Sequence, residues 1–528
     1  MSAVVKNQTI TIDGETLTLE QVVAVARYGA KADLHPAARE KVLRSREYVD
    51  HLIEGNQTVY GITTGFGMFS NVLISKEDAK KLQRNLIMSH ATGVGEPLPL
   101  EVVRVILLLR ANALAKGFSG IRLSTLETLL EVLNSGIVPV VPEKGSLGAS
   151  GDLAPLSHMV LVLLGEGEAF YKGRRMSGRK ALALSGIEPV VLEGKEGLAL
   201  INGTQVMTAI AALAVWDAEN LWESANITAA LSFEALNGIL DAFDPKIHIL
   251  RPHKGQIEVA KQIRLLTEGS SFVAPQQHPR VQDAYALRCV AQVHGPSGDA
   301  VAYVKKVVEI EMNSVTDNPL IFPEQGEVLS GGNFHGQPIA LAMDFLGIAV
   351  AELANIAERR LERLVNPNLS GLPAFLTPNG GLNSGFMIVQ YSAASLVSEN
   401  KILAHPASVD SIPSSGNQED HVSMGTIAAR KARSIIENTA HVLGMELLAA
   451  CQGVDLRTGN EGLQLGKGSE GAYRLVRSKV DTLGEDRVMY PDILVAKELV
   501  SSGKLVKEVR RKLGVKKCVN SETGFREF

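Results

Sequence analysis

The sequence predicts a mainly α-helical protein in which a long helical bundle follows a small α+β part at the N-terminus. Apolar residues recur at helical spacing over most of the chain, whereas the alternation typical of strands is nearly confined to its start. Long alanine-rich helical segments joined by loops of glycine, asparagine and proline are typical of a bundle core. We expect residues 1–115 to form the α+β region and residues 116–528 the bundle, its loops and a C-terminal helical tail.

Short-range signals define the beginning of the chain. Residues 9–12 (TITI) and 16–18 (TLT) alternate and flank Asp13-Gly14, a pattern typical of a β-hairpin. Thr18 and Gln21 stand three positions apart at the start of an apolar run, as in a capping box at the first turn of a helix. We therefore expect a hairpin that leads directly into a helix.

The segment 343–366 shows the helical period most clearly. Its apolar stripe consists of Leu346, Val350, Leu353, Ala357, Leu361 and Leu364. The other side carries Glu358, Arg359, Glu362 and Arg363. Segments 101–117, 204–223 and 425–450 have the same period. Since 204–223 is apolar around most of its circumference, we expect it to be buried within a bundle or an oligomer.

Composition excludes several classes of protein. The chain has 53 Lys and Arg against 57 Asp and Glu, which is too balanced for a nucleic-acid partner, and the basic stretch 504–517 is interpreted as a solvated helix face. Three cysteines, Cys289, Cys451 and Cys518, are too few for a disulfide framework or a cysteine metal site. The first residues turn polar too early for a secretory signal, and no apolar run reaches the ~20 residues of a membrane span. We expect a cytoplasmic protein without a metal.

Polar and glycine-rich residues gather in nine short islands between the helical segments. They are residues 60–67, 89–97, 145–155, 201–205, 281–289, 316–320, 331–338, 379–387 and 414–421. Loops on a rigid scaffold are where binding and catalytic residues concentrate. Islands that are this rich in Tyr, His, Asn, Gln and Arg indicate an active site assembled from several parts of the chain.

The island GSLGASGDLAP (145–155) fits neither of two familiar loop chemistries. It lacks the G-x-x-x-x-G-K-[ST] of a phosphate loop, and Gly151 arrives one residue too early for the G-x-S-x-G of a serine hydrolase. A helix entry capped by Asp152 explains the turn but not the Ala-Ser-Gly. In an acutely bent chain, the unhindered nitrogen of Gly151 could attack the carbonyl of Ala149. Loss of the Ser150 hydroxyl would then leave an electrophilic carbon, a role otherwise filled by a cofactor.

This stretch resembles the signature of the histidine and aromatic amino-acid ammonia-lyases. Other motifs of that family follow in its order from about residue 8 to about residue 460, among them YGITTGFG, SHATGVGEP, KEGLALINGTQ, VQDAYALRC, GGNFHGQPIA, NSGFM and PSSGNQEDHVSM. The motifs SHATGVGEP and NQEDHVSM are most similar to those of the histidine ammonia-lyases. Thr63 departs from that branch, because the position is often Asn there and often Thr in the phenylalanine and tyrosine enzymes.

The resemblance implies a fold and an activity. The fold is the helical bundle of the ammonia-lyase and fumarase/aspartase type, and the reaction converts L-histidine to trans-urocanate and ammonia. The tripeptide Ala149-Ser150-Gly151 would cyclise to 4-methylideneimidazol-5-one, so no external cofactor is expected. The family's sites are shared between subunits of a homotetramer, and we expect the same assembly here.

The resemblance also implies the catalytic residues around the ring. Tyr60 matches the base that removes the Cβ proton of the substrate, a group whose pKa its surroundings must lower. Tyr285 matches the second active-site tyrosine, and Asn202 matches the residue that hydrogen-bonds near the ring. Taken alone, Tyr60 could be a core aromatic residue and Asn202 part of an Asn-Gly turn.

Residues that bind substrate are implied in the same way. They are His90, Gln282, Arg288, Phe334, Met387 and Glu419. Arg288 stands three residues after Tyr285, so a helix would place both on one face, and a guanidinium pairs bidentately with a carboxylate. We assign Arg288 to the substrate carboxylate, with a surface salt bridge as the alternative. His90 and Glu419 could hydrogen-bond an imidazole, although Glu419 could equally pair with an arginine of the scaffold.

Other functions stay open at this point. The same chemistry on another substrate would make the protein a tyrosine or phenylalanine ammonia-lyase, or a 2,3-aminomutase of the same family. A binding protein on a degenerate lyase scaffold belongs to a different class, and the intact tripeptide argues against it. A serine hydrolase is the remaining alternative.

Overall fold

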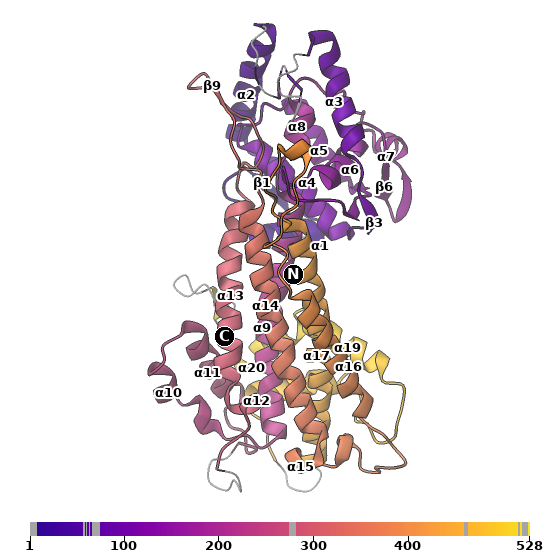
Figure 1. Cartoon of the computed structure of the whole chain (residues 1–528). Helices are drawn as coiled ribbons and strands as arrows, with labels where there is room; N and C mark the ends of the chain where they lie inside the picture. The colour runs from indigo at the N-terminus through magenta and orange to yellow at the C-terminus, as the bar shows by residue number, and fades with distance from the viewer. Residues whose placement is uncertain are drawn as a thin grey trace. The chain divides into compact units, whose positions relative to one another are not determined.

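A computed structural model describes residues 8–55, 59, 61–62, 64–65, 74–273, 281–458, 463–515, 518–519 and 526–527. The chain divides into two compact units. The first unit comprises residues 1–213, 305–343 and 406–430, and the second unit comprises residues 214–304, 344–405 and 431–528. Helices dominate both units, which confirms the mainly α-helical fold class (Figure 1). The expected boundary between residues 115 and 116 stays a prediction.

The first unit combines helices with short strands. Its helices are α1 (Leu19–Tyr28), α2 (Pro36–Glu54), α3 (Lys76–His90), α4 (Leu100–Ala115), α5 (Leu123–Ser135), α6 (Leu153–Leu163), α7 (Gly178–Ser185), α8 (Glu196–Ile201) and the 3-10 turn η5 (Ser415–Asn417). Its strands are β1 (Thr9–Ile12), β2 (Lys31–Leu34), β3 (Val94–Pro97), β4 (Val138–Pro139), β5 (Pro142–Lys144), β6 (Glu168–Tyr171), β7 (Arg174–Ser177), β8 (Leu320–Phe322) and β9 (Glu327–Leu329). The strands form the pairs β1–β2, β3–β5 and β8–β9 and the three-stranded sheet β4–β6–β7.

The hairpin predicted at the start of the chain is wrong. β1 pairs with β2 in parallel, Thr9 beside Lys31 and Ile12 beside Leu34, and α1 makes the connection. The Asp13 side chain accepts the backbone N–H groups of the two residues that follow Gly14, at 2.8 and 2.9 Å, so the turn is real but leads into a helix. The capping box of Thr18 and Gln21 is confirmed at the beginning of α1.

Four long helices have residues in both units: α9 (Gln205–Ala235), α13 (Val290–Glu311), α14 (Gln337–Val365) and α17 (Gly425–Thr458). The second unit also contains α10 (Pro245–Ile249), α11 (Lys254–Leu266), α12 (Tyr285–Arg288), α15 (Pro367–Ser370), α16 (Met387–Leu403), α18 (Lys467–Arg477), α19 (Tyr490–Ser501) and α20 (Lys504–Leu513). Short 3-10 turns η3 (Leu240–Phe243) and η4 (Ala374–Leu376) and the strand pair β10 (Cys518–Val519) and β11 (Arg526–Glu527) complete it.

Buried polar contacts connect the long helices within the second unit, where they run side by side as a bundle (Figure 1). Ser232 of α9 donates a hydrogen bond to Glu446 of α17 at 2.7 Å. Ser297 of α13 donates to the carbonyl of Ala349 in α14 at 2.8 Å. These bonds satisfy polar groups that burial would otherwise penalise.

Helix α14 confirms the predicted apolar stripe, and the charged side is more buried than predicted. All six stripe residues are buried: Leu346, Val350, Leu353, Ala357, Leu361 and Leu364. Glu358 is only 2% exposed and accepts a hydrogen bond from Gln390 of α16 at 2.6 Å. Arg360 is fully buried and donates to both carboxylate oxygens of Glu446, at 2.5 and 3.0 Å. By length and composition α14 could also span a membrane, but 67% of its apolar window is buried, as in a core helix.

The predicted solvated face of the C-terminal tail is present on α20, with one exception. Lys504, Lys507 and Arg511 are exposed, while Leu505, Val506 and Val509 pack inward. Arg510 is the exception, because it is 8% exposed and its guanidinium lies 2.8 Å from the carboxylate of Glu223. The tail is therefore anchored to α9 by a buried ion pair as well as by apolar packing.

Candidate active site

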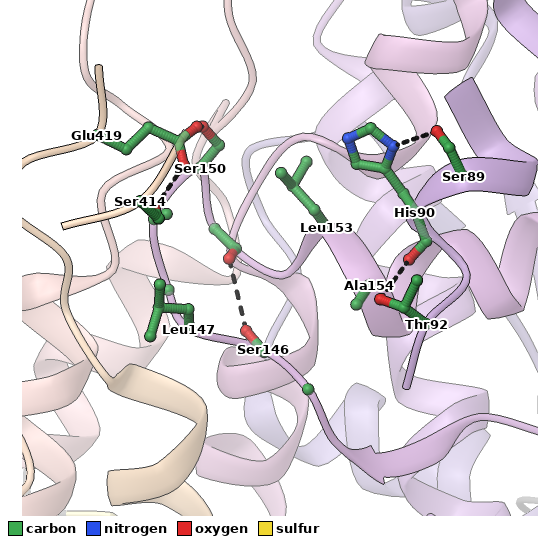
Figure 2. A pocket seen from close by; sticks show the side chains of 14 residues that line it. Ser89, His90, Thr92, Ser146, Leu147, Ser150, Leu153, Ala154, Ser414 and Glu419 are labelled. Carbon is green, nitrogen blue, oxygen red and sulfur yellow. Dashed lines mark hydrogen bonds between the residues drawn. The ribbon is translucent and has the colours of Figure 1, made fainter. Parts of the chain in front are cut away.

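A cavity of about 240 Å³ in the first unit is lined by three of the predicted islands. Residues 145–151 form much of its wall, Ser89, His90 and Thr92 contribute from the end of α3, and Ser414 and Glu419 from the segment before α17. Figure 2 shows Ser150 and Glu419 together on one side and His90 with Ser89 on the other. The volume is below the ~300–1,000 Å³ of sites for drug-sized ligands, so the cavity fits a small metabolite.

Two glycines of the 145–151 loop have conformations that only glycine adopts readily. Gly148 has φ +75° and Gly151 has φ +74°. A Cβ on Gly151 would lie 2.1 Å from the carbonyl oxygen of Gly203, and a Cβ on Gly148 would lie 2.3 Å from Oγ of Ser423. The loop is thus wedged between two other segments of the first unit. The glycines permit both the left-handed turns and the close approach.

Hydrogen bonds hold the loop on both sides of the tripeptide, but they do not involve the Ala149 carbonyl or the Gly151 N–H. The carbonyls of Leu147, Gly148 and Ser150 all accept hydrogen bonds. Among the described residues, the carbonyl of Ala149 accepts none and the N–H of Gly151 donates none. These are the two groups that the cyclisation expected from the sequence would join, and hydrogen bonds hold the loop around them.

The segment 202–203 fixes the downstream side. Nδ2 of Asn202 donates to the Ser150 carbonyl at 2.9 Å, and the N–H of Asp152 donates to the Gly203 carbonyl at 2.7 Å. Arg110 of α4 holds this segment in place, because its buried guanidinium donates to the Asn202 carbonyl at 2.9 Å. Burial lowers the pKa of Arg110 to about 10, against the opposing effect of nearby carboxylates, so the side chain remains charged at neutral pH.

Asp152 does more than begin a helix. Its side chain makes no cap to α6, contrary to the sequence prediction; instead its carboxylate accepts the N–H groups of Val206 and Met207, both at 2.9 Å, in the first turn of α9. Ser146 donates to the other carboxylate oxygen at 2.8 Å, and so does Thr426. A carboxylate at a helix N-terminus is favourable because the free N–H groups there need acceptors. Burial raises the pKa of Asp152, while these four hydrogen bonds oppose the shift.

Glu419 contacts the central residue of the tripeptide. Oγ of Ser150 donates to Oε1 of Glu419 at 2.9 Å, and Oγ of Ser414 donates to Oε2 at 3.1 Å (Figure 2). Backbone hydrogen bonds between Ser414 and Glu419 in both directions close the short loop that carries the carboxylate. Glu419 is therefore positioned towards the cavity, and the arginine partner considered from the sequence is not what the described contacts show.

His90 ends α3 with a defined ring orientation. The Ser89 hydroxyl donates to the Leu86 carbonyl at 3.1 Å, so its oxygen is left to accept from Nδ1 of His90 at 3.0 Å. That assignment makes Nε2 a hydrogen-bond acceptor. Burial lowers the pKa of His90, with the Leu86 carbonyl and the charge of Glu419 acting in the opposite direction. The imidazole is thus neutral at neutral pH.

His158 of α6 supports the turn that follows His90. Its Nε2 accepts the backbone N–H of Gly93 at 3.0 Å, and burial lowers its pKa. A neutral ring is required, because a protonated Nε2 would face an N–H donor. His158 connects the helix that begins after the tripeptide to the turn that follows His90.

Three predicted residues lie together in the second unit. Tyr285 and Arg288 belong to α12, and the guanidinium carbon of Arg288 is 4.7 Å from the ring centre of Tyr285. Arg288 also donates to Oε1 of Gln282 at 2.9 Å. Tyr285 is 71% exposed. The shared face expected from the spacing is present, and the carboxylate-binding role of Arg288 stays a prediction.

The remaining predicted residues are not among those that line the cavity. Phe334 precedes α14 in the first unit, and Met387 is the first residue of α16 in the second; both are half-buried. Tyr60 and Thr63 lie outside the described residues, so the proton-abstracting role of Tyr60 is untested. Within the described residues, no group of three or more His, Cys, Asp or Glu side chains is arranged to hold a metal ion.

Sequence reasoning missed several residues that build the site. Ser423, Asp152 as the carboxylate anchor of α9, Arg110 and His158 all act through contacts with segments far away in the chain. The available signal was that Ser423 stands inside the motif PSSGNQEDHVSM and that His158 follows GSLGASGDLAP by three residues. Arg110 lies in the apolar helix α4, where an arginine is itself a sign of a buried partner.

Comparison with known proteins gives a consistent result. A model of the aromatic amino acid lyase family matches residues 17–478. A histidine ammonia-lyase of Alkaliphilus oremlandii is 62% identical over 502 residues, which cover 95% of this chain and 98% of that protein. The crystal structure of histidine ammonia-lyase from Trypanosoma cruzi has 44% identity and a TM-score of 0.90, covering 98% of this chain and 97% of the other. Tyrosine aminomutase from Streptomyces globisporus has 41% identity and a TM-score of 0.92, with 96% and 99% covered.

Proposed function

The chain belongs to the aromatic amino acid lyase family, and we propose that it is a histidine ammonia-lyase that converts L-histidine to trans-urocanate and ammonia. The observation that carries the proposal is the high identity, over nearly the whole chain, to a protein named histidine ammonia-lyase. The fold alone does not choose the substrate, because an aminomutase acting on tyrosine superposes equally well. The chain works, by the same proposal, in the cytoplasm.

The polar groups of the cavity also favour histidine over phenylalanine. Nε2 of His90 and the carboxylate of Glu419 are both hydrogen-bond acceptors. An imidazole offers N–H donors to such groups, whereas a phenyl ring offers none and would leave both acceptors unpaired. His90 and Glu419 are half-buried, so a ligand that covers them without donating a hydrogen bond costs their desolvation and binds less well.

The electrophile is proposed to form from Ala149, Ser150 and Gly151. The Gly151 nitrogen attacks the Ala149 carbonyl carbon, and its proton moves to the carbonyl oxygen. Loss of that hydroxyl with the Ser150 N–H as one water forms a C=N bond, and loss of the Ser150 hydroxyl with its Cα–H as a second water forms the exocyclic C=C bond. The residues fit this group, since a Cβ at position 151 would collide with the Gly203 carbonyl and the reacting amide and carbonyl have no partner among the described residues.

The ring supplies an electrophilic carbon that activates the substrate amino group as a leaving group. The protein's own residues would do the rest. We propose that Arg288 binds the substrate carboxylate and that Tyr60 takes the Cβ proton, with Tyr285 as the second active-site tyrosine. Asn202 already donates to the Ser150 carbonyl and keeps that role. Oε1 of Glu419, which holds the departing Ser150 hydroxyl, becomes available to a substrate N–H afterwards.

A homotetramer with shared sites is the proposed assembly. Large apolar side chains stay exposed along one side of α14, at Leu341, Phe345 and Ile348, and on α16, at Ile388 and Tyr391. Helix faces of this kind are typical of an interface between copies. Static light scattering on the purified protein tests the assembly: four chain masses are expected, and a monomer at micromolar concentration would refute it.

The substrate is tested by incubating the purified protein with histidine, tyrosine and phenylalanine in parallel. We expect release of ammonia and the ultraviolet absorbance of the unsaturated acid with histidine alone. An aminomutase would instead convert tyrosine to its β-isomer with no ammonia. Activity with tyrosine but not with histidine would refute the assignment.

The electrophile is tested with Ser150→Ala, which cannot lose the hydroxyl. Ser157→Ala is the matched control, since Ser157 is another buried serine of the same region whose hydroxyl only bonds to the Leu153 carbonyl within α6. The mass of the 149–151 peptide should be lower by two waters in the parent and in the control but not in Ser150→Ala. An unmodified peptide in an active parent protein would contradict the proposal.

A further inference from the structure

Resting on the proposed ring formation, we propose that Ser423 is a positioning residue for that cyclisation. Its hydroxyl and its backbone N–H both hold the Gly148 carbonyl and so fix the upstream side of the loop. With that side fixed, the Ala149 carbonyl stays turned towards the Gly151 nitrogen.

The contacts on which this rests form a compact clamp. The N–H of Ser423 donates to the Gly148 carbonyl at 3.2 Å, and its Oγ donates to the same oxygen at 3.1 Å. The N–H of Met424 donates to the preceding carbonyl, that of Leu147, at 3.2 Å. The Ser423 oxygen also accepts the N–H of Gly425 at 3.3 Å, which orients the hydroxyl hydrogen towards the loop. Ser423 is fully buried, so water does not compete for these bonds.

Backbone strain lies at the same place. Met424 is buried and has φ +55°, a left-handed conformation that side chains other than glycine rarely adopt. Such a conformation persists only where the surrounding structure imposes it, and it is concentrated at functional sites. At the same place, two successive N–H groups, from Ser423 and Met424, donate to two successive carbonyls of the loop.

The clamp acts on the peptide group next to the reacting carbonyl. The Gly148 carbonyl shares a planar peptide unit with the nitrogen of Ala149, so holding the oxygen restricts rotation before Ala149. Asn202 and Gly203 hold the chain after the reacting carbonyl. Ring closure within a chain is fast only when the attacking and attacked atoms are kept in a reactive geometry. A loop held only downstream would let the Ala149 carbonyl turn away.

The test follows ring formation directly. Parent protein, Ser423→Ala, Ser423→Cys and the control Ser157→Ala are made by cell-free translation for a short pulse, and intact mass is recorded over time. The dehydrated fraction of folded chains gives the rate. Removing a buried hydrogen bond that positions a reacting group is expected to slow dehydration by roughly tenfold. Ser423→Cys fills the same space with a weak donor, so it should be slowed too.

The outcomes separate the inference from the proposed function. Slow dehydration in both Ser423 variants, with normal dehydration in Ser157→Ala and unchanged turnover per dehydrated site, supports the positioning role. Parent-like dehydration in Ser423→Ala or Ser423→Cys overturns it. If Ser423→Ala does not fold, as judged by circular dichroism, Ser423→Cys alone decides. A parent protein that never loses two waters would refute the proposed function itself.

Discussion

Replacing Gly151 with alanine tests how tightly the loop is wedged. The residue has φ +74°, and the added Cβ would lie 2.1 Å from the carbonyl oxygen of Gly203 and 2.4 Å from its carbon. The left-handed conformation alone costs a residue with a Cβ about 1–2 kcal/mol. Inserting a methyl group where backbone already stands adds about 1–3 kcal/mol of overpacking. We expect the variant to lose about 2–5 kcal/mol of unfolding free energy.

The chain supplies a matched control for this substitution. Gly136 ends α5 with φ +78°, and no atom lies within 4 Å of a Cβ built there. Gly136→Ala should therefore lose only the conformational part, about 1–2 kcal/mol. The difference between the two variants isolates the contact with Gly203.

Two measurements on the same samples decide the result. Urea titrations at equal protein concentration give the unfolding free energies, and peptide mass gives the dehydrated fraction at 149–151. Gly151→Ala should be less stable than Gly136→Ala and should fail to lose water, because the shifted loop no longer aligns its reacting groups. Equal stability and equal dehydration in both variants would refute the wedged geometry.

Three further predictions follow from buried groups. Arg360→Met should lower the free energy of unfolding in urea titrations by about 3–5 kcal/mol, because it leaves the Glu446 charge buried and unpaired. The double variant Arg360→Met/Glu446→Leu should recover most of this loss. A double variant as unstable as Arg360→Met would contradict the prediction. Asp152→Asn should slow dehydration of the tripeptide in the mass assay, because the amide offers one acceptor oxygen where the carboxylate serves four donors; a parent-like rate would count against the anchor. Burial lowers the pKa of His158 in the folded chain, so the unfolded chain binds a proton at a higher pH than the folded chain does. The free energy of unfolding therefore decreases as the pH is lowered below the usual pKa of 6.5. His158→Gln, which keeps an acceptor for Gly93, should show a shallower fall between neutral and mildly acidic pH, and an identical slope would refute the reasoning.

The helices were predictable because the information for them is local. The stripe from Leu346 to Leu364 is written in the 3.6-residue period, and the capping box at Thr18 needs only the next three residues. The hairpin prediction was wrong because the partner of the first strand is set by contacts with distant parts of the chain. The Leu17 N–H donates to Asn313 at 2.9 Å, and β1 finds its partner beyond α1. A turn signal predicts the turn but not the strand that follows it.

The site was predictable as far as motifs contain it. The tripeptide, His90 and Glu419 line one cavity, and their catalytic and substrate-binding roles stay predictions. The burial of Arg360 depends on its contact with Glu446, and the clamp by Ser423 depends on its contact with Gly148. Sequence periodicity does not predict such contacts between distant segments. The relation of Arg288 to Tyr285 could be anticipated because both belong to one turn of helix.

The contacts of Asp152 imply that the proposed ring formation depends on the prior folding of α9. Its carboxylate accepts the N–H groups of Val206 and Met207, and these two groups point the same way only once α9 has begun to form. Asn202 and Gly203, which hold the tripeptide, immediately precede the same helix. If the ring forms as proposed, a nascent or misfolded chain keeps an ordinary serine at position 150. On that proposal, we expect the reactive carbon only in chains that have completed this part of the fold.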